Sequence, residues 1–294
     1  MLIFKRLIKI IKPFRYISLL TTYILGAGLV QYVQNMRSWL IFFQGLFFLI
    51  LTTISFDFLA FLIQINDPRG EFNDLCLKDR KQLRLSSALT SATLLTIAII
   101  IFVDWMVKGI LWQGLGFLML LLGIAGLSYV ISLGNEKISL FQILFETVLF
   151  VILPPAFAYF LQSEDLHRLL AMVVLSLIPA YIAFRLLAQL LAFDRDPNGG
   201  NHHLIKAIGW EQSMFLHNAL ILLSFFLYAI DALLGFPWFL LWPVFLTLPI
   251  GLLEVWLMER VRRGGKPLWR AMRVSTACVY FLPMYLIGFA FWIR

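Results

Sequence analysis

The apolar run IFFQGLFFLILTTISFDFLAFLIQI, residues 41 to 65, decides the fold class of this chain. A helix of this length crosses a hydrocarbon core of about 30 Å. Similar runs recur along the sequence, which is 61% hydrophobic, contains 28 phenylalanines and has only 14% charged residues. Soluble domains average about 25% charged residues. The sequence therefore predicts an all-α, polytopic membrane protein.

Nine transmembrane helices are predicted, and together they form one membrane domain over residues 1–294 without a separate soluble domain. The residues before the first span, 1–15, are basic and apolar and lack a small-residue cleavage site, so no removable signal peptide is expected. Their lysines and arginines recur at near-helical spacing, which predicts a short interfacial segment on anionic lipids. The predicted spans are 17–34, 41–65, 87–107, 110–132, 139–161, 169–193, 212–234, 238–257 and 274–293.

The basic residues predict the orientation of the chain. With a cytoplasmic N-terminus, 19 of the 24 lysines and arginines fall in cytoplasmic segments and four in outside segments, while Arg185 lies within a span. Such an asymmetry is typical of inner loops. The long connections 66–86, 194–211 and 258–273 are then cytoplasmic, and the C-terminus is outside.

Carboxylates gather where the second span ends. At about 100° per residue, Asp67, Glu71 and Asp74 share one helical face, with Asn66 at its edge. Neighbouring carboxylates repel one another, and oxygen ligands without Cys or His suit Mg²⁺, which binds through a few carboxylates and substrate phosphates. The alternative is that these are ordinary loop charges paired with nearby basic residues.

A second acidic helix end follows the sixth span, at Asp194 and Asp196. The glycines at 199 and 200 permit a tight turn with exposed N–H groups, which suits phosphate. The histidines at 202 and 203 have no third Cys or His ligand nearby, so they are predicted to be polar loop residues rather than transition-metal ligands. Two acidic helix ends on one membrane face predict that the two halves of the chain converge on one site.

These motifs resemble those of a known family. The first reads Asn66, Asp67, Gly70 and Asp74, and is followed by KQLRLSSALT at residues 81–90; the second reads Asp196, Gly200, His203, Leu204 and Gly209. In these motifs, and in IKPFRYISLLTTYILGAGL at residues 11–29, the chain resembles the UbiA superfamily of intramembrane prenyltransferases over most of its length. The resemblance implies nine spans and two aspartate-rich motifs that bind Mg²⁺ and an isoprenoid diphosphate at the cytoplasmic side.

The chain departs from the family pattern at two positions. Gly70 and Ala192 stand where motif aspartates are expected, so the implied metal site has fewer carboxylates. Glu71 points within about 40° of Asp67 and is a candidate replacement. In a continuous helix Asp194 points about 160° away from Asp196, and the two converge only if the turn before Pro197 unwinds.

The resemblance implies an enzyme that transfers an isoprenyl group from a prenyl diphosphate to an aromatic or lipid acceptor. Its Mg²⁺ ligands and catalytic carboxylates would be Asp67, Asp74 and Asp196, with Glu71 and Asp194 as auxiliary ligands. The partners are membrane lipids and hydrophobic substrates, and no nucleic acid is expected. Two alternatives stay open: a non-catalytic lipid- or partner-binding protein of the same fold, and a membrane terpene cyclase. The candidate diphosphate-binding residues are Asn66, Lys78, Arg80, Lys81, Arg185 and Lys206.

Polar side chains within the spans are expected to face the bundle interior, because each is unfavourable in hydrocarbon. They form either a substrate pocket or a polar clamp between helices, such as Asp57 with Arg185. Prolines at 154, 155 and 179 predict kinks in their helices. The polar residues concerned are Asp57, Gln64, Glu146, Arg185, Gln189 and Glu254.

Overall fold

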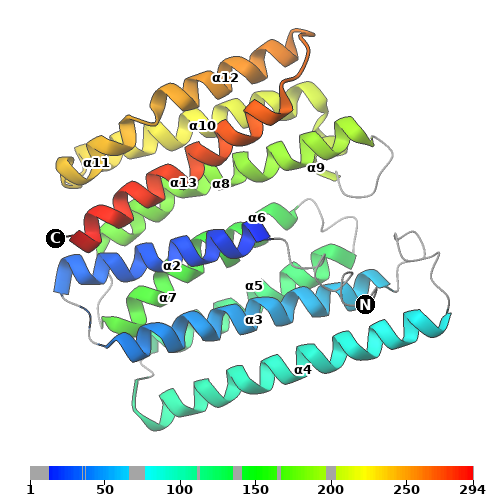
Figure 1. Ribbon diagram of the computed structural model, residues 1–294. Helices are drawn as coiled ribbons and strands as arrows, with labels where there is room; N and C mark the ends of the chain where they lie inside the picture. Colours follow the sequence, from blue (N-terminus) through cyan, green and yellow to red (C-terminus); the bar gives the residue numbers. More distant parts are fainter. Residues whose placement is uncertain are drawn as a thin grey trace. The chain divides into compact units, whose positions relative to one another are not determined.

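The computed structural model describes residues 13–34, 36, 38–65, 77–110, 113–134, 141–163, 167–196 and 203–293. Within these ranges the chain is helical and has no β-strand (Figure 1). In chain order the helices are α2 (Pro13–Gln34), α3 (Trp39–Ile65), α4 (Leu77–Val107), α5 (Gln113–Gly134), α6 (Gln142–Thr147), the π-helix η2 (Val148–Ile152), α7 (Leu153–Gln162), α8 (Arg168–Arg195), α9 (His203–Ile208), α10 (Trp210–Leu233), α11 (Trp238–Phe245), α12 (Leu248–Arg262) and α13 (Trp269–Ile293).

Nine helical stretches in the described part of the chain are long and apolar enough to cross a membrane. Each overlaps one of the nine predicted spans, which confirms the all-α polytopic fold and makes the chain an integral, multi-pass membrane protein. The third span begins at Arg80 rather than at residue 87, because polar first turns extend the helix beyond its apolar part. Two spans are composite, since α6, η2 and α7 form one and α11 and α12 form another.

The helices form two compact units. The first contains residues Met1–Leu20 and Arg37–Glu164, and the second contains Thr21–Met36 and Asp165–Arg294. In the first unit α3 packs against α4, α5 and α7. In the second, α8 packs against α10 and α13, and α12 packs against both α10 and α13.

The core of the first unit is aromatic. Phe48 on α3 stacks on Phe157 of α7 with ring centroids 5.6 Å apart, and Trp105 of α4 contacts both rings. The indole Nε1 of Trp105 donates to Gln44 Oε1 at 3.2 Å, which satisfies two polar groups within the membrane span. Aromatic packing and one polar contact thus join three spans. Exposed Ile and Val side chains cover the outer face of α4.

The fifth span is irregular just before its prolines. The π-helical stretch η2 ends at Ile152, just before Pro154 and Pro155. Neither proline has an N–H group to donate to the carbonyl of Phe150 one turn earlier. The hydroxyl of Ser18 on α2 donates to that carbonyl instead, at 3.4 Å. By contrast, α8 remains helical through Pro179.

Candidate functional site

The acidic residues predicted to follow the second span, Asp67, Glu71 and Asp74, lie outside the described residues. The neighbouring Asn66 and the side chain of Lys78 also lie outside them. Their flanks are described. Helix α3 ends at Ile65, and Arg80 in the first turn of α4 donates to its main-chain carbonyl from Nε, at 2.7 Å, and from Nη2. A C-terminal carbonyl of a helix has no intrahelical partner and attracts a cation.

This contact gives Arg80 a role that the sequence did not predict. The guanidinium joins the end of α3 to the start of α4, the two helices that flank residues 66–76 in sequence. Lys81, the next predicted diphosphate-binding residue, is exposed. Arg80 is therefore a positioning residue for this connection, whereas Lys81 remains accessible to a ligand.

The second acidic helix end is described up to Asp196. Helix α8 continues to Arg195, and the N–H of Asp196 still donates to the carbonyl of Ala192 at 3.0 Å. The backbone of Asp196 then leaves the helix, with φ −146° and ψ 88°. The chain thus unwinds at Asp196 but not at Asp194, and both side chains are exposed.

A neighbouring helix orients Asp194. Its Oδ2 accepts a hydrogen bond from Trp269 Nε1 of α13 at 2.8 Å. Lys206 on α9 is exposed. The remaining predicted residue, Arg185, lies half-buried on α8, one turn before the half-buried Gln189.

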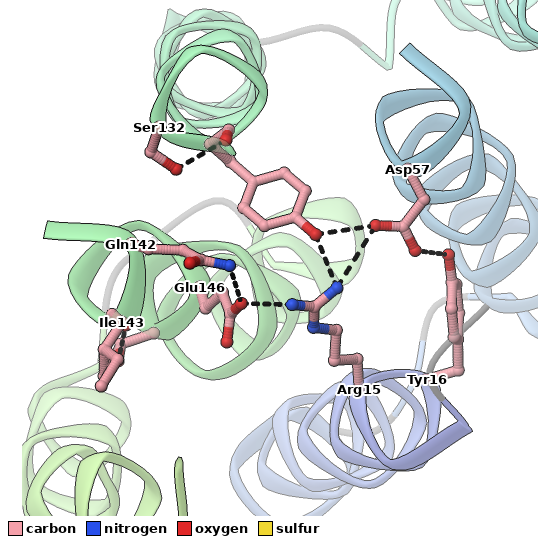
Figure 2. A network of polar contacts seen from close by, with 9 residues as sticks. Arg15, Tyr16, Asp57, Ser132, Gln142, Ile143 and Glu146 are labelled. Atoms are coloured by element: carbon pink, nitrogen blue, oxygen red, sulfur yellow. Dashed lines mark hydrogen bonds and ion pairs between the residues drawn. The ribbon is translucent and has the colours of Figure 1, made fainter. Parts of the chain in front are cut away.

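A buried polar network lies in the first unit (Figure 2). Its centre is Arg15 on α2, which is 3% exposed. The guanidinium donates from Nη1 to the hydroxyl of Tyr129 on α5 at 2.6 Å, and from Nη2 to Glu146 Oε1 on α6. Its Nη1 also lies 3.5 Å from Asp57 Oδ1 on α3. The guanidinium of Arg15 on α2 thus contacts residues on three other helices, α3, α5 and α6.

Two phenols and an amide complete the network in Figure 2. Tyr16 donates to Asp57 Oδ2 at 2.6 Å, and Tyr129 donates to Asp57 Oδ1 at 2.9 Å. Gln142 Nε2 donates to Glu146 Oε1 at 3.1 Å. Each carboxylate is therefore held by the guanidinium and by at least one neutral donor, the arrangement that makes a buried charge tolerable.

The network confirms part of the sequence interpretation and corrects part. Asp57 and Glu146, predicted to face the interior, are 4% and 0% exposed. The sequence allowed Asp57 to line a substrate pocket or to form a polar clamp between helices, and the structure shows the clamp. Its ion-pair partner is Arg15, not the Arg185 suggested from the sequence. Arg15 itself was assigned to the interfacial segment, and it is instead buried because two carboxylates compensate its charge.

Sequence reasoning missed Tyr16, Tyr129 and Gln142. Tyrosines near span ends usually anchor a helix at the membrane interface, so nothing local marks these two as internal hydrogen-bond donors. It also missed His217 and Asp231 within the seventh span, both now buried. For these a signal was available, because an ionisable residue in an apolar run is by default a candidate functional residue.

The described carboxylates and histidines do not by themselves form a metal centre. Among the described residues no three His, Cys, Asp or Glu side chains are grouped so as to hold a metal ion. Most of the predicted Mg²⁺ ligands lie in the undescribed segment after α3, and only Asp194 and Asp196 fall within the described chain. In comparisons with known proteins, no family model matches this chain and no curated protein matches its sequence.

Proposed function

We propose that the protein is an intramembrane prenyltransferase of the UbiA type, which moves an isoprenyl group from a prenyl diphosphate to an aromatic or lipid acceptor. One observation carries this proposal: the second and sixth of the nine spans each lead into carboxylates. Asp67 and Asp74 follow α3, and Asp196 stands exposed where α8 ends.

Alternation of the spans puts the two acidic ends on one membrane face. Each crossing reverses direction, so the second and sixth spans leave the membrane on the same side. With Arg15 buried, 18 basic residues still fall in the segments assigned to that side against four opposite. This bias supports a cytoplasmic location for the acidic ends.

The residues at these ends fit Mg²⁺, because carboxylate oxygens are the hard ligands that this ion prefers. Asp67, Asp74 and Asp196 would hold it, with Glu71 as an auxiliary ligand. Asp194 is less suited, since one of its oxygens already accepts from Trp269. When bound, the ion neutralises the diphosphate as it leaves the isoprenyl carbon.

Basic side chains near the same ends would stabilise the diphosphate. Lys81 on α4 and Lys206 on α9 are exposed; Lys81 follows the first acidic segment in sequence and Lys206 follows the second, and Lys78 precedes Lys81. Arg80 would act through Ile65, by joining the end of α3 to the start of α4. Charge stabilisation of this kind, with water excluded by the membrane, supplies most of the rate enhancement expected for the transfer.

The test is an assay of diphosphate release by the purified full chain in lipid nanodiscs. We expect release from geranylgeranyl diphosphate that requires both Mg²⁺ and an aromatic acceptor. Asp196→Asn should abolish it. The matched control is Asp104→Asn, which changes an exposed aspartate that pairs with Lys108 at the end of α4.

The same assay separates the alternatives. Release without an acceptor identifies a cyclase or a hydrolase, because the diphosphate then leaves without intermolecular transfer. No release with a broad panel of acceptors favours the non-catalytic lipid- or partner-binding protein. Equal activity of the Asp196→Asn and Asp104→Asn variants would remove Asp196 from the site.

A further inference from the structure

The connection between α12 and α13 in the second unit concentrates positive charge (Figure 1). Residues 259–273, which form this basic hairpin, contain a single carboxylate, Glu259. The span Trp238–Arg262 ends and the span Trp269–Ile293 begins within the hairpin, so it lies at one surface of the membrane. Its cationic side chains are all exposed; they are Arg260, Arg262, Arg263, Lys266, Arg270 and Arg273.

Backbone hydrogen bonds fix the turn of the hairpin. Gly264 has φ +85°, and its N–H donates to the carbonyl of Val261 at 2.9 Å. The N–H of Gly265 donates to the carbonyl of Arg260, also at 2.9 Å. This pair of bonds is a Schellman motif, which satisfies the last carbonyls of a helix. The cationic side chains are therefore not needed to cap α12, and they project from a turn of defined geometry.

Most of these cations have no acidic partner. Glu259 accepts from Arg262 at 2.7 Å and from Arg263 at 3.0 Å. A cation near the start of a helix, as on α13, is disfavoured by the partial positive charge of the helix N-terminus. The stability of the hairpin therefore does not account for its charge. Within the described chain four side chains form neither an ion pair nor a hydrogen bond: Arg260, Lys266, Arg270 and Arg273.

Exposed apolar side chains continue from these cations along both helices. Leu252 and Trp256 on α12 are 51% and 58% exposed, and intervals of four residues put them on one helical face with Arg260. On α13, Val274 is 63% exposed and lies one turn from Arg270. Each helix thus presents a cation at the membrane surface and an apolar side chain deeper in its span. A phospholipid has the same order, with its phosphate outside its acyl chains.

We propose that the basic hairpin binds the headgroup of an anionic phospholipid, whose acyl chains lie along the exposed apolar faces of α12 and α13. Clusters of cationic side chains beside a span attract anionic headgroups, and a zwitterionic headgroup without net charge is attracted less. Arg260 and Arg270 stand where the two apolar faces begin, so they are assigned the main part in recognition, while Lys266 and Arg273 add to the attraction.

The apolar faces favour a lipid over a soluble anion. Inorganic phosphate or diphosphate presents similar charge, but it leaves Trp256 and Val274 without a partner outside the protein. The inference is independent of the proposed transferase activity, because no residue assigned to that activity lies in the hairpin.

The experiment is a thermal-shift titration of the full chain in mixed micelles with phosphatidylglycerol or with phosphatidylcholine of the same acyl chains. A ligand that binds only the folded state raises the melting temperature as its concentration rises. We expect phosphatidylglycerol to raise the melting temperature of the wild type more than phosphatidylcholine does. Raising the salt from about 0.1 M to about 1 M should remove most of this difference, because the cations are exposed and the salt screens them.

The test variant is Arg260→Gln with Arg270→Gln, which removes one cation from each helix. Its affinity for phosphatidylglycerol should fall about thirtyfold, since each basic residue at an anionic surface contributes a factor of about five. Arg260→Lys with Arg270→Lys keeps both charges and should retain most of the response. The matched control is Lys108→Gln with Arg168→Gln, which removes two exposed cations that the alternation of the spans puts at the other membrane face. It should respond like the wild type.

Three outcomes would overturn the proposal. Equal responses of the wild type to the two lipids would show that the headgroup charge is not recognised. An unchanged phosphatidylglycerol affinity of the Arg260→Gln, Arg270→Gln variant would remove the hairpin from the lipid site. Inorganic diphosphate that stabilises the wild type as much as phosphatidylglycerol does, but not the variant, would identify a site for a soluble anion. Should the variant fail to fold, a phosphatidylglycerol preference of the wild type that persists at about 1 M salt would itself refute the proposal.

Discussion

Arg80 in the first turn of α4 donates to the main-chain carbonyl of Ile65, the last residue of α3, from Nε at 2.7 Å and from Nη2. A carbonyl at a helix C-terminus carries partial negative charge and has no partner within its own helix. The contact connects two neighbouring spans at the point where the acid-bearing segment begins. The first prediction therefore tests whether Arg80 holds these two helix ends in position.

Arg80→Gln should destabilise the protein and impair metal-dependent activity together. A hydrogen bond from a charged group contributes about 1.5–3 kcal/mol, and partial exposure of Arg80 places the expected loss at about 1–2 kcal/mol. The control is Lys81→Gln, the next residue and exposed, which should change stability by less than about 0.5 kcal/mol. Equilibrium unfolding in mixed micelles measures both, and equal stabilities would contradict the capping role.

Arg15→Met should be among the most destabilising substitutions in the first unit. It leaves Asp57 and Glu146 buried without their cation, and breaking a buried ion pair costs about 3–5 kcal/mol of unfolding free energy. Adding Asp57→Asn and Glu146→Gln removes the unpaired charges and should restore more than half of the loss. Unfolding measurements on Arg15→Met, on the Asp57→Asn with Glu146→Gln variant and on the triple variant give the coupling.

The control for that series is Lys108→Met. Lys108 pairs with Asp104 at 2.6 Å, but both side chains are well exposed, and surface pairs of this kind contribute about 0–1 kcal/mol. A loss from Lys108→Met as large as that from Arg15→Met would mean that burial does not set the strength of the Arg15 network.

Cysteine accessibility tests the topology. In a chain without Cys76 and Cys278, single cysteines replace Lys81, Lys206 or Lys108. The bias in basic residues predicts that positions 81 and 206 react with a membrane-impermeant reagent from the cytoplasmic side and position 108 from the other. Labelling of positions 81 and 206 from opposite sides would refute both the span order and a shared site.

Restoring the two motif aspartates should strengthen Mg²⁺ binding. Gly70→Asp with Ala192→Asp adds hard oxygen ligands, and by linkage a tighter site raises the melting temperature more at a given Mg²⁺ concentration. Without metal the added carboxylates repel their neighbours, so the apo variant should be less stable. The measurement is a thermal-shift titration with Mg²⁺ and a prenyl diphosphate analogue, and identical responses of variant and original would show that these positions do not face the metal.

The fold could be predicted from the sequence because each span is specified locally. Helix α3 runs from Trp39 to Ile65, close to the apolar run at 41–65. In hydrocarbon a chain must satisfy its own backbone hydrogen bonds, so an apolar segment of this length has one stable form, a helix. The same reasoning predicted that Asp57, Glu146 and Glu254 point inward, since each is unfavourable towards lipid.

The partners of those inward residues were decided by the tertiary structure alone. Arg15 reaches Glu146 across 131 positions of sequence, and Tyr129 reaches Asp57 across 72. Many residues could compensate a buried carboxylate, and only the packing of four helices selects Arg15. Likewise, the sequence determines that Asp196 follows the sixth span, but whether the helix ends at Asp194 or Asp196 depends on hydrogen bonds such as that from Trp269. Local solvation fixes which segments cross the membrane, whereas contacts between distant segments fix which charges meet.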